Sequence, residues 1–387
     1  MIVTVLGAGM MGSEIALDLA SKTYVDQLAV VDNSPPRLQL LHAKAKERLR
    51  DNHSKISTHV IDIVNEKDAL QRLLRRSDAA VGALPHSVAR FGVENAVEAE
   101  VDYVDLIYSW SLQEQSEQLN KQAKSRGIAI IPACGLAPGL SNILAKRAVE
   151  EVGGEAEELT IYVGGIPQRP EPPLEYNVVF SAESVLEEYS RDALVVRKGE
   201  RVLLPALSEV EEVCFSSLPN YKFEAFVTDG LSTLPLTTRA MNMTEKTVRW
   251  PGHSAKIRLL AQLGLLSEET LAIDDGISVT PRKLLERLFM LKLSMTEHDR
   301  DMTLLKVTAK SYKTSASYEM IDRYDEVTKT TSMARTTGYP CSIVVQFLLE
   351  RKLTEKGFLP PEEAVSRELF QDFLNRLKEK GIEVVRQ

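Results

Sequence analysis

The sequence predicts an α/β protein with an N-terminal domain of the Rossmann type followed by a mixed α+β domain with a largely antiparallel sheet. Three observations predict this fold class. Strand-like apolar runs alternate with helical runs through the first 135 residues, a glycine-rich turn follows the first run, and hairpin patterns replace the alternation later in the chain. Such alternation is typical of a parallel sheet with helices on both faces.

The first apolar run, residues 2–6, leads into the turn Gly7-Ala8-Gly9-Met10-Met11-Gly12, and a helical pattern follows. A G-x-G-x-x-G turn between a strand and a helix indicates a dinucleotide site. Gly7 allows a sharp turn, Gly9 lets the backbone approach a pyrophosphate, and Gly12 lets the helix pack on the strand. We therefore expect the phosphates at the helix N-terminus. A glycine turn that binds nothing is the alternative.

The second apolar run ends at Asp32, twenty residues after Gly12. A carboxylate at this position accepts hydrogen bonds from the adenosine ribose and repels a 2′-phosphate. The sequence therefore predicts NAD as the cofactor in preference to NADP. Arg37 is close enough in sequence to soften that preference.

Composition excludes several function classes. The 387 residues carry a formal net charge of −8, which argues against nucleic-acid and anionic-membrane partners. No apolar stretch approaches the roughly 20 residues of a membrane span. The three cysteines and six histidines lack metal-ligand spacing, so we expect no metal and reduced thiols. Because the glycine motif begins directly after Met1, we expect no targeting sequence and a cytoplasmic location.

In the first domain, strands at 59–63, 79–84, 103–107 and 128–132 alternate with helices at 36–52, 65–75, 88–99 and 112–126. Ligands of such sheets bind beyond the C-terminal ends of the strands. A solvent-facing loop histidine is the alternative for His86. The predicted cofactor-binding residues are Gly7, Gly9, Met10, Met11, Gly12, Asp32, Asn33, Asp62, Ile63, Ala83, Leu84, Pro85, His86, Ile107, Gly135 and Pro138.

The pattern changes after Gly135. A hairpin at 194–204 turns at Lys198-Gly199, and Pro340 fits the first turn of a helix over 342–352. We expect that helix, and one at 367–380, to return to the first domain. The predicted division is 1–136 with 338–387, and 137–337. The other predicted elements are helices at 140–151, after Ser181 or Ser184, at 254–264 and at 281–294, and strands at 159–163, 222–227, 246–250, 302–311 and 316–324.

Several segments, in order along the chain, resemble the saccharopine dehydrogenase superfamily and most of all its L-lysine 6-dehydrogenase branch. They are 134–142 (CGLAPGLSN), 163–167 (VGGIP), 228–234 (TDGLSTL), 246–253 (KTVRWPGH) and 333–340 (MARTTGYP). The resemblance implies NAD-dependent oxidative deamination of the ε-amino group of L-lysine to 2-aminoadipate 6-semialdehyde, ammonia and NADH. It also implies a homo-oligomer, normally a dimer, that binds a small-molecule amine or amino-acid substrate.

This reaction needs a neutral amine beside the nicotinamide, because an ammonium has no lone pair to expel hydride, and a base for the attacking water. The candidate catalytic residues are Asp229, Tyr176 and His253. The alternatives are an Asx-turn acid for Asp229, a packing tyrosine for Tyr176 and a helix-start capping residue for His253.

Arg249 alternates with Val248 and Trp250, so its side chain faces the side opposite to theirs. A guanidinium fork matches a carboxylate, which makes Arg249 the first choice for the substrate carboxylate, and a surface arginine is the alternative. Cys341 is expected to be a packing residue. The predicted substrate-binding residues are Arg249, Arg239, Ser232, Thr233 and Thr337.

Two other functions stay open. One is a saccharopine- or carboxynorspermidine-type reductase that joins an amine to a carbonyl with NAD(P)H, although Asp32 counts against a phosphate-bearing cofactor. The other is a protein that binds NAD without turning it over.

Overall fold

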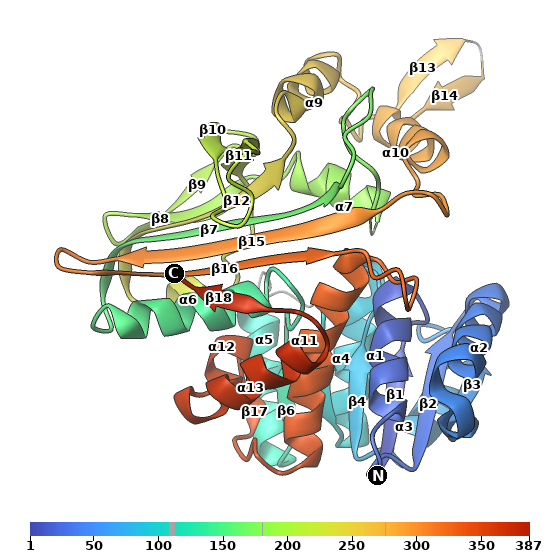
Figure 1. The fold of residues 1–387 in the computed structure, drawn as a ribbon. Coiled ribbons are helices and arrows are strands. Elements are labelled where there is room, and N and C mark those ends of the chain that lie inside the picture. The colour runs from blue at the N-terminus through green and yellow to red at the C-terminus, as the bar shows by residue number, and fades with distance from the viewer. Residues whose placement is uncertain (108–112, 180, 275) are drawn as a thin grey trace. The chain divides into compact units, whose positions relative to one another are not determined.

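The structure is a computed structural model that describes residues 1–107, 113–179, 181–274 and 276–387. The chain forms two compact units (Figure 1). The first, which we call the parallel unit, consists of Met1–Leu144, Ser232–Thr237 and Ala334–Ile382. The second, the antiparallel unit, consists of Ala145–Leu231, Thr238–Met333 and Glu383–Gln387.

The parallel unit contains a seven-stranded sheet in the order β17-β6-β5-β4-β1-β2-β3, and every neighbouring pair is parallel. The strand order reverses between β1 and β4, which is where such sheets bind ligands. The predicted α/β fold class is confirmed. The strands are β1 (Ile2–Leu6), β2 (Gln27–Asp32), β3 (Ile56–Val60), β4 (Ala79–Gly82), β5 (Asp102–Asp105), β6 (Ala129–Ile131) and β17 (Gly357–Phe358).

Helices connect these strands because each crossover between parallel strands must return along a face of the sheet. The strand β1 is almost completely buried, as expected for a strand covered on both faces. The division between the two units falls within α6 and α11. The helices that lie wholly or partly in this unit are α1 (Met10–Ala20), α2 (Pro35–Leu49), the 3₁₀ turn η1 (Arg50–Lys55), α3 (Lys67–Leu74), α4 (His86–Ala99), α5 (Gln113–Ser125), α6 (Leu140–Glu151), α8 (Leu234–Thr237), α11 (Ser332–Leu349), α12 (Pro361–Ala364) and α13 (Arg367–Glu379).

The bounds of the strand predicted at 59–63 are wrong, since β3 runs from Ile56 to Val60. Asp62 ends it, because its Oδ1 accepts the backbone N–H groups of Val64 and Asn65, at 2.9 and 3.3 Å. This hydrogen-bonded turn is characteristic of aspartate. The isoleucines on either side of Asp62 are still buried, which explains why an apolar pattern alone extended the strand too far.

The prediction that Pro340 begins a helix is also wrong. Pro340 lies inside α11, which starts eight residues earlier, at Ser332. The carboxylate of Asp301 accepts the backbone N–H groups of Ser332 and Met333, at 2.8 and 2.9 Å, and so caps the helix start. A capped start and apolar packing outweigh the one backbone hydrogen bond that a proline removes.

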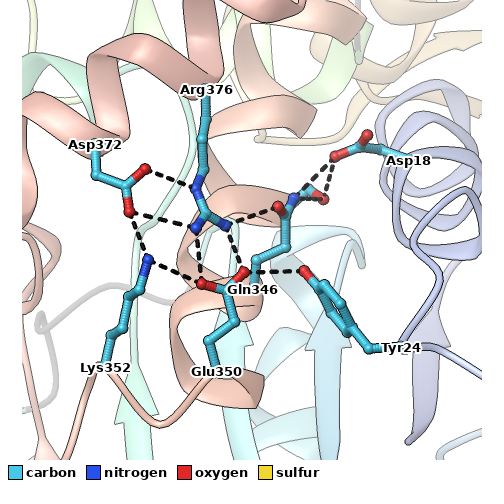
Figure 2. A network of polar contacts seen from close by, with 8 residues as sticks. Asp18, Tyr24, Gln346, Glu350, Lys352, Asp372 and Arg376 are labelled. Atoms are coloured by element: carbon cyan, nitrogen blue, oxygen red, sulfur yellow. Dashed lines mark hydrogen bonds and ion pairs between the residues drawn. The ribbon is translucent and has the colours of Figure 1, made fainter.

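A polar network joins α11, α13 and the first βα segment within the parallel unit (Figure 2). The guanidinium of Arg376 donates two hydrogen bonds of 2.7 Å to Glu350 and one of 3.0 Å to Asp372. It also donates to the side chain of Gln346, whose amide donates to Asp18 on α1. The C-terminal helices are therefore attached to α1 by charge-assisted bonds.

The antiparallel unit contains a nine-stranded sheet, and most of its strand pairs are antiparallel, as predicted. Its long strands β7, β15 and β16 run side by side (Figure 1), and β12 pairs in parallel with β7. The strands are β7 (Ala156–Pro167), β8 (Ala193–Arg197), β9 (Glu200–Leu204), β10 (Glu211–Val213), β11 (Phe223–Val227), β12 (Ala240–Arg249), β15 (Asp301–Lys310), β16 (Ser315–Arg323) and β18 (Val384–Arg386).

The antiparallel unit also contains further helices and a separate hairpin. The Ser181 hydroxyl accepts the backbone N–H of Ser184 and caps the first helix. The elements are α7 (Ala182–Glu188), α9 (His253–Gln262), α10 (Pro281–Lys292), β13 (Leu271–Asp274) and β14 (Ile277–Val279).

At the C-terminus, β18 pairs with β16, so residues 383–387 belong to the antiparallel unit although they were expected on the first domain. The predicted domain boundaries as a whole stay a prediction. Over the residues described, no helix is long and apolar enough to span a bilayer.

Candidate functional site

The reversal of strand order in the parallel unit is built from two close backbone segments. Gly7 has φ of +103°, and a Cβ at this position would lie 2.3 Å from the carbonyl oxygen of Ala83. The Ala83 N–H donates to the Leu6 carbonyl at 2.8 Å, and the Gly7 N–H donates to Val31 at 2.7 Å. Gly7 is therefore required both for its backbone angle and for this close approach.

The start of α1 fits a pyrophosphate. Gly9 is the N-cap residue, no side chain caps the helix, and a Cβ on Gly9 would meet nothing within 4 Å. Gly12, in contrast, packs so closely on the turn that a Cβ would lie 2.0 Å from the Gly7 carbonyl oxygen. Backbone N–H groups at a helix start with open space before them bind phosphate. A bound nicotinamide dinucleotide would be held here by the turn and would supply a hydride acceptor.

Asp32 ends β2 beside this turn. Its Oδ2 accepts the N–H of Ala8, and its Oδ1 accepts the N–H of Ser34, both at 2.8 Å. The carboxylate is buried and lies 3.9 Å from the exposed guanidinium of Arg37. Asp32 therefore orders the turn, and its remaining lone pairs can accept ribose hydroxyls.

The other predicted cofactor residues of this unit differ in accessibility. Asn33, Pro85 and His86 are exposed, Met10 is 39% exposed, and Met11, Asp62, Ala83, Ile107 and Pro138 are half-buried. Ile63, Leu84 and Gly135 are buried. A Cβ on Gly135 would lie 3.2 Å from the Thr337 methyl group, so these two predicted residues are brought together. The cofactor roles of this set stay predictions.

In the antiparallel unit, the structure brings together Arg249, Tyr176 and His253, and adds Tyr189. The Arg249 guanidinium is buried 4.8 Å from the centre of the Tyr176 ring and donates from Nε to the Tyr189 hydroxyl at 3.0 Å. The Tyr176 and His253 rings are 5.6 Å apart. Burial and the positive charge of Arg249 act in opposite directions on Tyr189, and burial prevails, raising its pKa to about 12.

The hydrogen bonds of His253 define its tautomer. Nδ1 lies 2.8 Å from the carbonyl oxygen of Leu174, which can only accept, so Nδ1 carries the proton. Nε2 then accepts from the Tyr189 hydroxyl at 2.9 Å. Burial, followed by the charge of Arg249, lowers the pKa of His253 to about 3. Both ring nitrogens are thus occupied in a neutral imidazole, which favours a structural role over a catalytic one.

Asp229 lies in the loop after β11 and is the most accessible of the three candidate catalytic residues, with its side chain 31% exposed. Its carboxylate is 3.1 Å from Nε of Arg191 and accepts the N–H of Leu194 at 3.2 Å. Through the N–H of Leu194, Asp229 therefore holds the neighbouring strand β8.

Three carboxylates lie near one another, and one of them contacts Arg249. Glu188, at the end of α7, accepts from the Thr247 hydroxyl and lies 3.7 Å from Arg249. Glu245 is buried on β12, and burial raises its pKa to about 8, with Glu188 and Asp229 adding to the shift. We call Glu188, Asp229 and Glu245 the carboxylate cluster.

The remaining predicted substrate residues lie elsewhere. Arg239 is exposed and pairs with the exposed Glu155 at 3.2 Å. In the parallel unit, Thr233 is buried and donates to Glu362 at 2.7 Å, while Ser232 has φ of +49° and a buried hydroxyl. Cys341 is buried, as expected of a packing residue.

The sequence interpretation missed Glu188, Tyr189, Glu245 and Thr247. For the two residues on β12 a signal was available, because positions 245, 247 and 249 alternate and share one face of a strand. Within the described part of the chain, no group of three or more His, Cys, Asp or Glu residues is arranged to hold a metal ion.

Two family models match the chain. The one described as the saccharopine dehydrogenase NADP binding domain matches residues 3–131, and the one described as the saccharopine dehydrogenase C-terminal domain matches residues 135–382. The chain is 21% identical over 397 residues to the mitochondrial alpha-aminoadipic semialdehyde synthase of Rattus norvegicus, covering 84% of this chain and 42% of that protein. It thus spans less than half the length of that relative.

A second relative is covered almost throughout. The saccharopine dehydrogenase [NADP(+), L-glutamate-forming] of Pyricularia oryzae is 22% identical over 404 residues, covering 84% of this chain and 88% of that protein. Among solved structures, apo saccharopine dehydrogenase (L-Glu forming) from Saccharomyces cerevisiae has a TM-score of 0.78 at 20% identity, covering 100% of this chain and 99% of that one. At this identity the similarity establishes the fold.

Proposed function

The chain belongs to the saccharopine dehydrogenase family of oxidoreductases, and on this premise we propose that it oxidises the ε-amino group of L-lysine with NAD. The products are 2-aminoadipate 6-semialdehyde, ammonia and NADH. The main support for a redox reaction with a nicotinamide dinucleotide is the turn at Gly7–Gly12. It has open space before Gly9, and no side chain caps the start of α1. The lysine assignment is supported by the motifs around Asp229, Arg249 and His253.

Charge supports an amine substrate. Glu188, one member of the carboxylate cluster, contacts Arg249 in the antiparallel unit, so negative groups suited to an amine and a positive group suited to a carboxylate occur together. Arg249 would bind a substrate carboxylate by giving up its 3.7 Å contact with Glu188, which is longer than a hydrogen bond.

Asp229 is the proposed base for the water that attacks the iminium, because it is more accessible than Tyr176 or His253. The proton of the water passes to its carboxylate, and its contact with Arg191 positions it. Asp229→Asn is expected to abolish turnover and leave nucleotide affinity nearly intact. Unchanged turnover would remove Asp229 from this role.

NAD is proposed as the cofactor on the strength of Asp32, because its buried carboxylate lies beside the turn, where it would repel a 2′-phosphate. A cytoplasmic homo-oligomer also remains part of the proposal. Light scattering on the purified protein measures its mass, and a monomer at micromolar concentration would contradict the assembly.

A second candidate function is supported by the descriptions of one matching family model and one relative. The family model that matches residues 3–131 is described as NADP-binding, and the Pyricularia oryzae relative is a saccharopine dehydrogenase. An enzyme of that type would join an amine to a carbonyl and reduce the product with NADPH.

The experiment that separates these functions is nucleotide absorbance at 340 nm at alkaline pH. L-lysine, a panel of diamines and other amino acids are supplied with NAD and NADP in parallel. Lysine-dependent NADH with released ammonia supports the proposal. Silence with lysine, together with NADPH oxidation when an amine and a semialdehyde or keto acid are supplied, supports the condensing reaction. If neither signal appears, the result supports a protein that binds the nucleotide without turning it over.

A further inference from the structure

The Glu245 carboxyl group is buried with one of its oxygens unsatisfied by the described part of the chain. The residue is 4% exposed, and among the residues that the structure describes its Oε2 has no hydrogen-bond partner. An unsatisfied buried polar atom costs about 1–3 kcal/mol, more if charged, so the burial of this oxygen requires an explanation.

The other two members of the carboxylate cluster are already held. Glu188 accepts from Thr247 and faces Arg249, and Asp229 is held by Arg191. The Thr247 hydroxyl is in turn 2.9 Å from the Thr228 hydroxyl. The cations and hydroxyls of this region are therefore committed to Glu188 and Asp229, and Glu245 has carboxylates as its charged neighbours.

Glu245 also lies directly against the loop that carries Asp229. A Cβ on Gly230 would lie 1.6 Å from Oε1 of Glu245 and 2.5 Å from Oε2. Only a residue without a side chain at position 230 leaves room for the carboxyl group. The Glu245 carboxyl group therefore occupies the space that a side chain at position 230 would fill.

We propose that Glu245, with Glu188 and Asp229 beside it, receives the primary amine of the substrate and accepts its proton. This step rests on the proposed oxidation of an alkylamine. An alkylammonium carries three N–H donors and one positive charge, which match the unsatisfied oxygen and the excess of carboxylates. Glu245 first releases its own proton to solvent. One N–H bond of the ammonium then breaks and an O–H bond forms on Glu245, so the nitrogen regains its lone pair and no oxidant is consumed.

The protonation of Glu245 supports this role. Burial, with the charges of Glu188 and Asp229 added, raises its pKa to about 8, and Arg249 and Arg191 face those two carboxylates rather than Glu245. At pH 7 the free protein therefore holds a proton on Glu245. Placing an ammonium there releases one proton to solvent, whether the bound pair is ammonium and carboxylate or amine and carboxylic acid.

The test is calorimetric titration of protein saturated with NADH, which cannot oxidise an amine, in phosphate and in Tris buffer. The probes are L-lysine, n-butylamine and L-norleucine, which has no ε-amine. For the two amines we expect about one proton released at pH 7 and almost none at pH 9. Glu245→Gln should abolish this release and weaken amine binding at least about tenfold, with norleucine unaffected.

Glu319→Gln is the matched control, because Glu319 is a buried glutamate of the same unit that pairs with Lys306. It should keep both the proton release and the affinity. Wild-type protein that binds no amine, or binds one without proton release at pH 7, overturns the proposal, and this result does not depend on whether a variant folds. Unchanged affinity and proton release in folded Glu245→Gln also overturn it.

The outcomes separate the subsite from the reaction. If n-butylamine binds with a proton release that Glu245→Gln abolishes, and L-lysine is not oxidised, the amine subsite stands and the assignment to lysine fails. If L-lysine is oxidised and Glu245→Gln changes neither proton release nor affinity, the reaction stands and the subsite fails.

Discussion

The Tyr189 hydroxyl donates to Nε2 of His253 at 2.9 Å, in the buried interior of the antiparallel unit. The same oxygen accepts the Nε–H of Arg249. One hydroxyl group therefore satisfies an imidazole acceptor and a guanidinium donor together. This fixes the neutral form of His253 and the position of Arg249.

Tyr189→Phe is expected to lower the free energy of unfolding by about 2–4 kcal/mol, because it leaves two buried polar groups without their partner. Denaturant unfolding measures this. Tyr162→Phe is the matched control, since the Tyr162 hydroxyl donates to Glu211 in an exposed position, and it should cost less than about 1 kcal/mol. Equal losses in the two variants would contradict the role assigned to the Tyr189 hydroxyl.

His253 should make stability depend on pH below neutrality. Its pKa is about 3 in the folded protein against an ordinary 6.5, so the folded state disfavours the protonated ring. The stabilisation is complete above pH 6.5 and is lost as the pH falls from 6.5 towards 3, by at most about 1.4 kcal/mol per pH unit. Unfolding of wild type and His253→Asn at pH 6.5, 5.5 and 4.5 measures it, and the variant should show the shallower slope. Equal slopes in wild type and variant would show that His253 does not cause this pH dependence.

Sequence patterns predicted the features that depend on neighbouring residues. The turn at Gly7–Gly12 combines a close approach and a helix start within six positions, so its glycines could be interpreted directly. The exact end of β3 could not, because the apolar pattern continues past Asp62 while the hydrogen bonds of that side chain turn the chain. Pro340 was misplaced since its helix is started by Asp301, 31 residues before Ser332.

The carboxylate cluster shows a different limit. Glu245 could have been found by extending the alternation of β12 from Arg249, but Glu188 comes from α7, and strand periodicity does not relate it to β12. Even with both residues identified, the absence of a partner for Oε2 of Glu245 within the described residues depends on the contacts of Glu188 with Thr247 and of Asp229 with Arg191. Those contacts are long-range, and no local pattern encodes them.

Arg376 should stabilise the parallel unit more than the neighbouring Lys352 does (Figure 2). Its hydrogen bonds, opposed by burial and assisted by Lys352, bring the pKa of Glu350 to about 2 from an ordinary 4.5. That stabilisation is present above pH 4.5 and is lost as the pH falls towards 2. Arg376→Met should cost about 2–3 kcal/mol at pH 7, given a partly buried bidentate pair.

Lys352→Met is the comparison, because the Lys352 side chain is 37% exposed and an exposed ion pair contributes less than about 1 kcal/mol. Urea unfolding of both variants at pH 7 and pH 3.5 measures the difference. The difference in free energy of unfolding between Arg376→Met and wild type should be smaller at pH 3.5 than at pH 7. A gap that is the same at both pH values would mean that the charge of Glu350 is not involved.

Asp32 and Arg37 should act in opposite directions on the choice of nucleotide. Asp32→Asn keeps one oxygen for the backbone N–H groups of Ala8 or Ser34 and removes the negative charge, so the penalty on a 2′-phosphate should fall and the preference for NADH over NADPH should drop at least about tenfold. Arg37→Ala removes an exposed cation 3.9 Å from Asp32 and should weaken NADPH more than NADH.

Fluorescence titration with NADH and NADPH gives the four dissociation constants that these two variants require, with wild type as the reference. Asp32→Ala serves as the contrast, because it also removes the acceptor of two backbone N–H groups and should weaken both nucleotides through a less ordered turn. If Asp32→Asn leaves the ratio of the two constants unchanged, repulsion by Asp32 does not decide the cofactor, and the ratio must then come from Arg37 or from residues nearer the adenine.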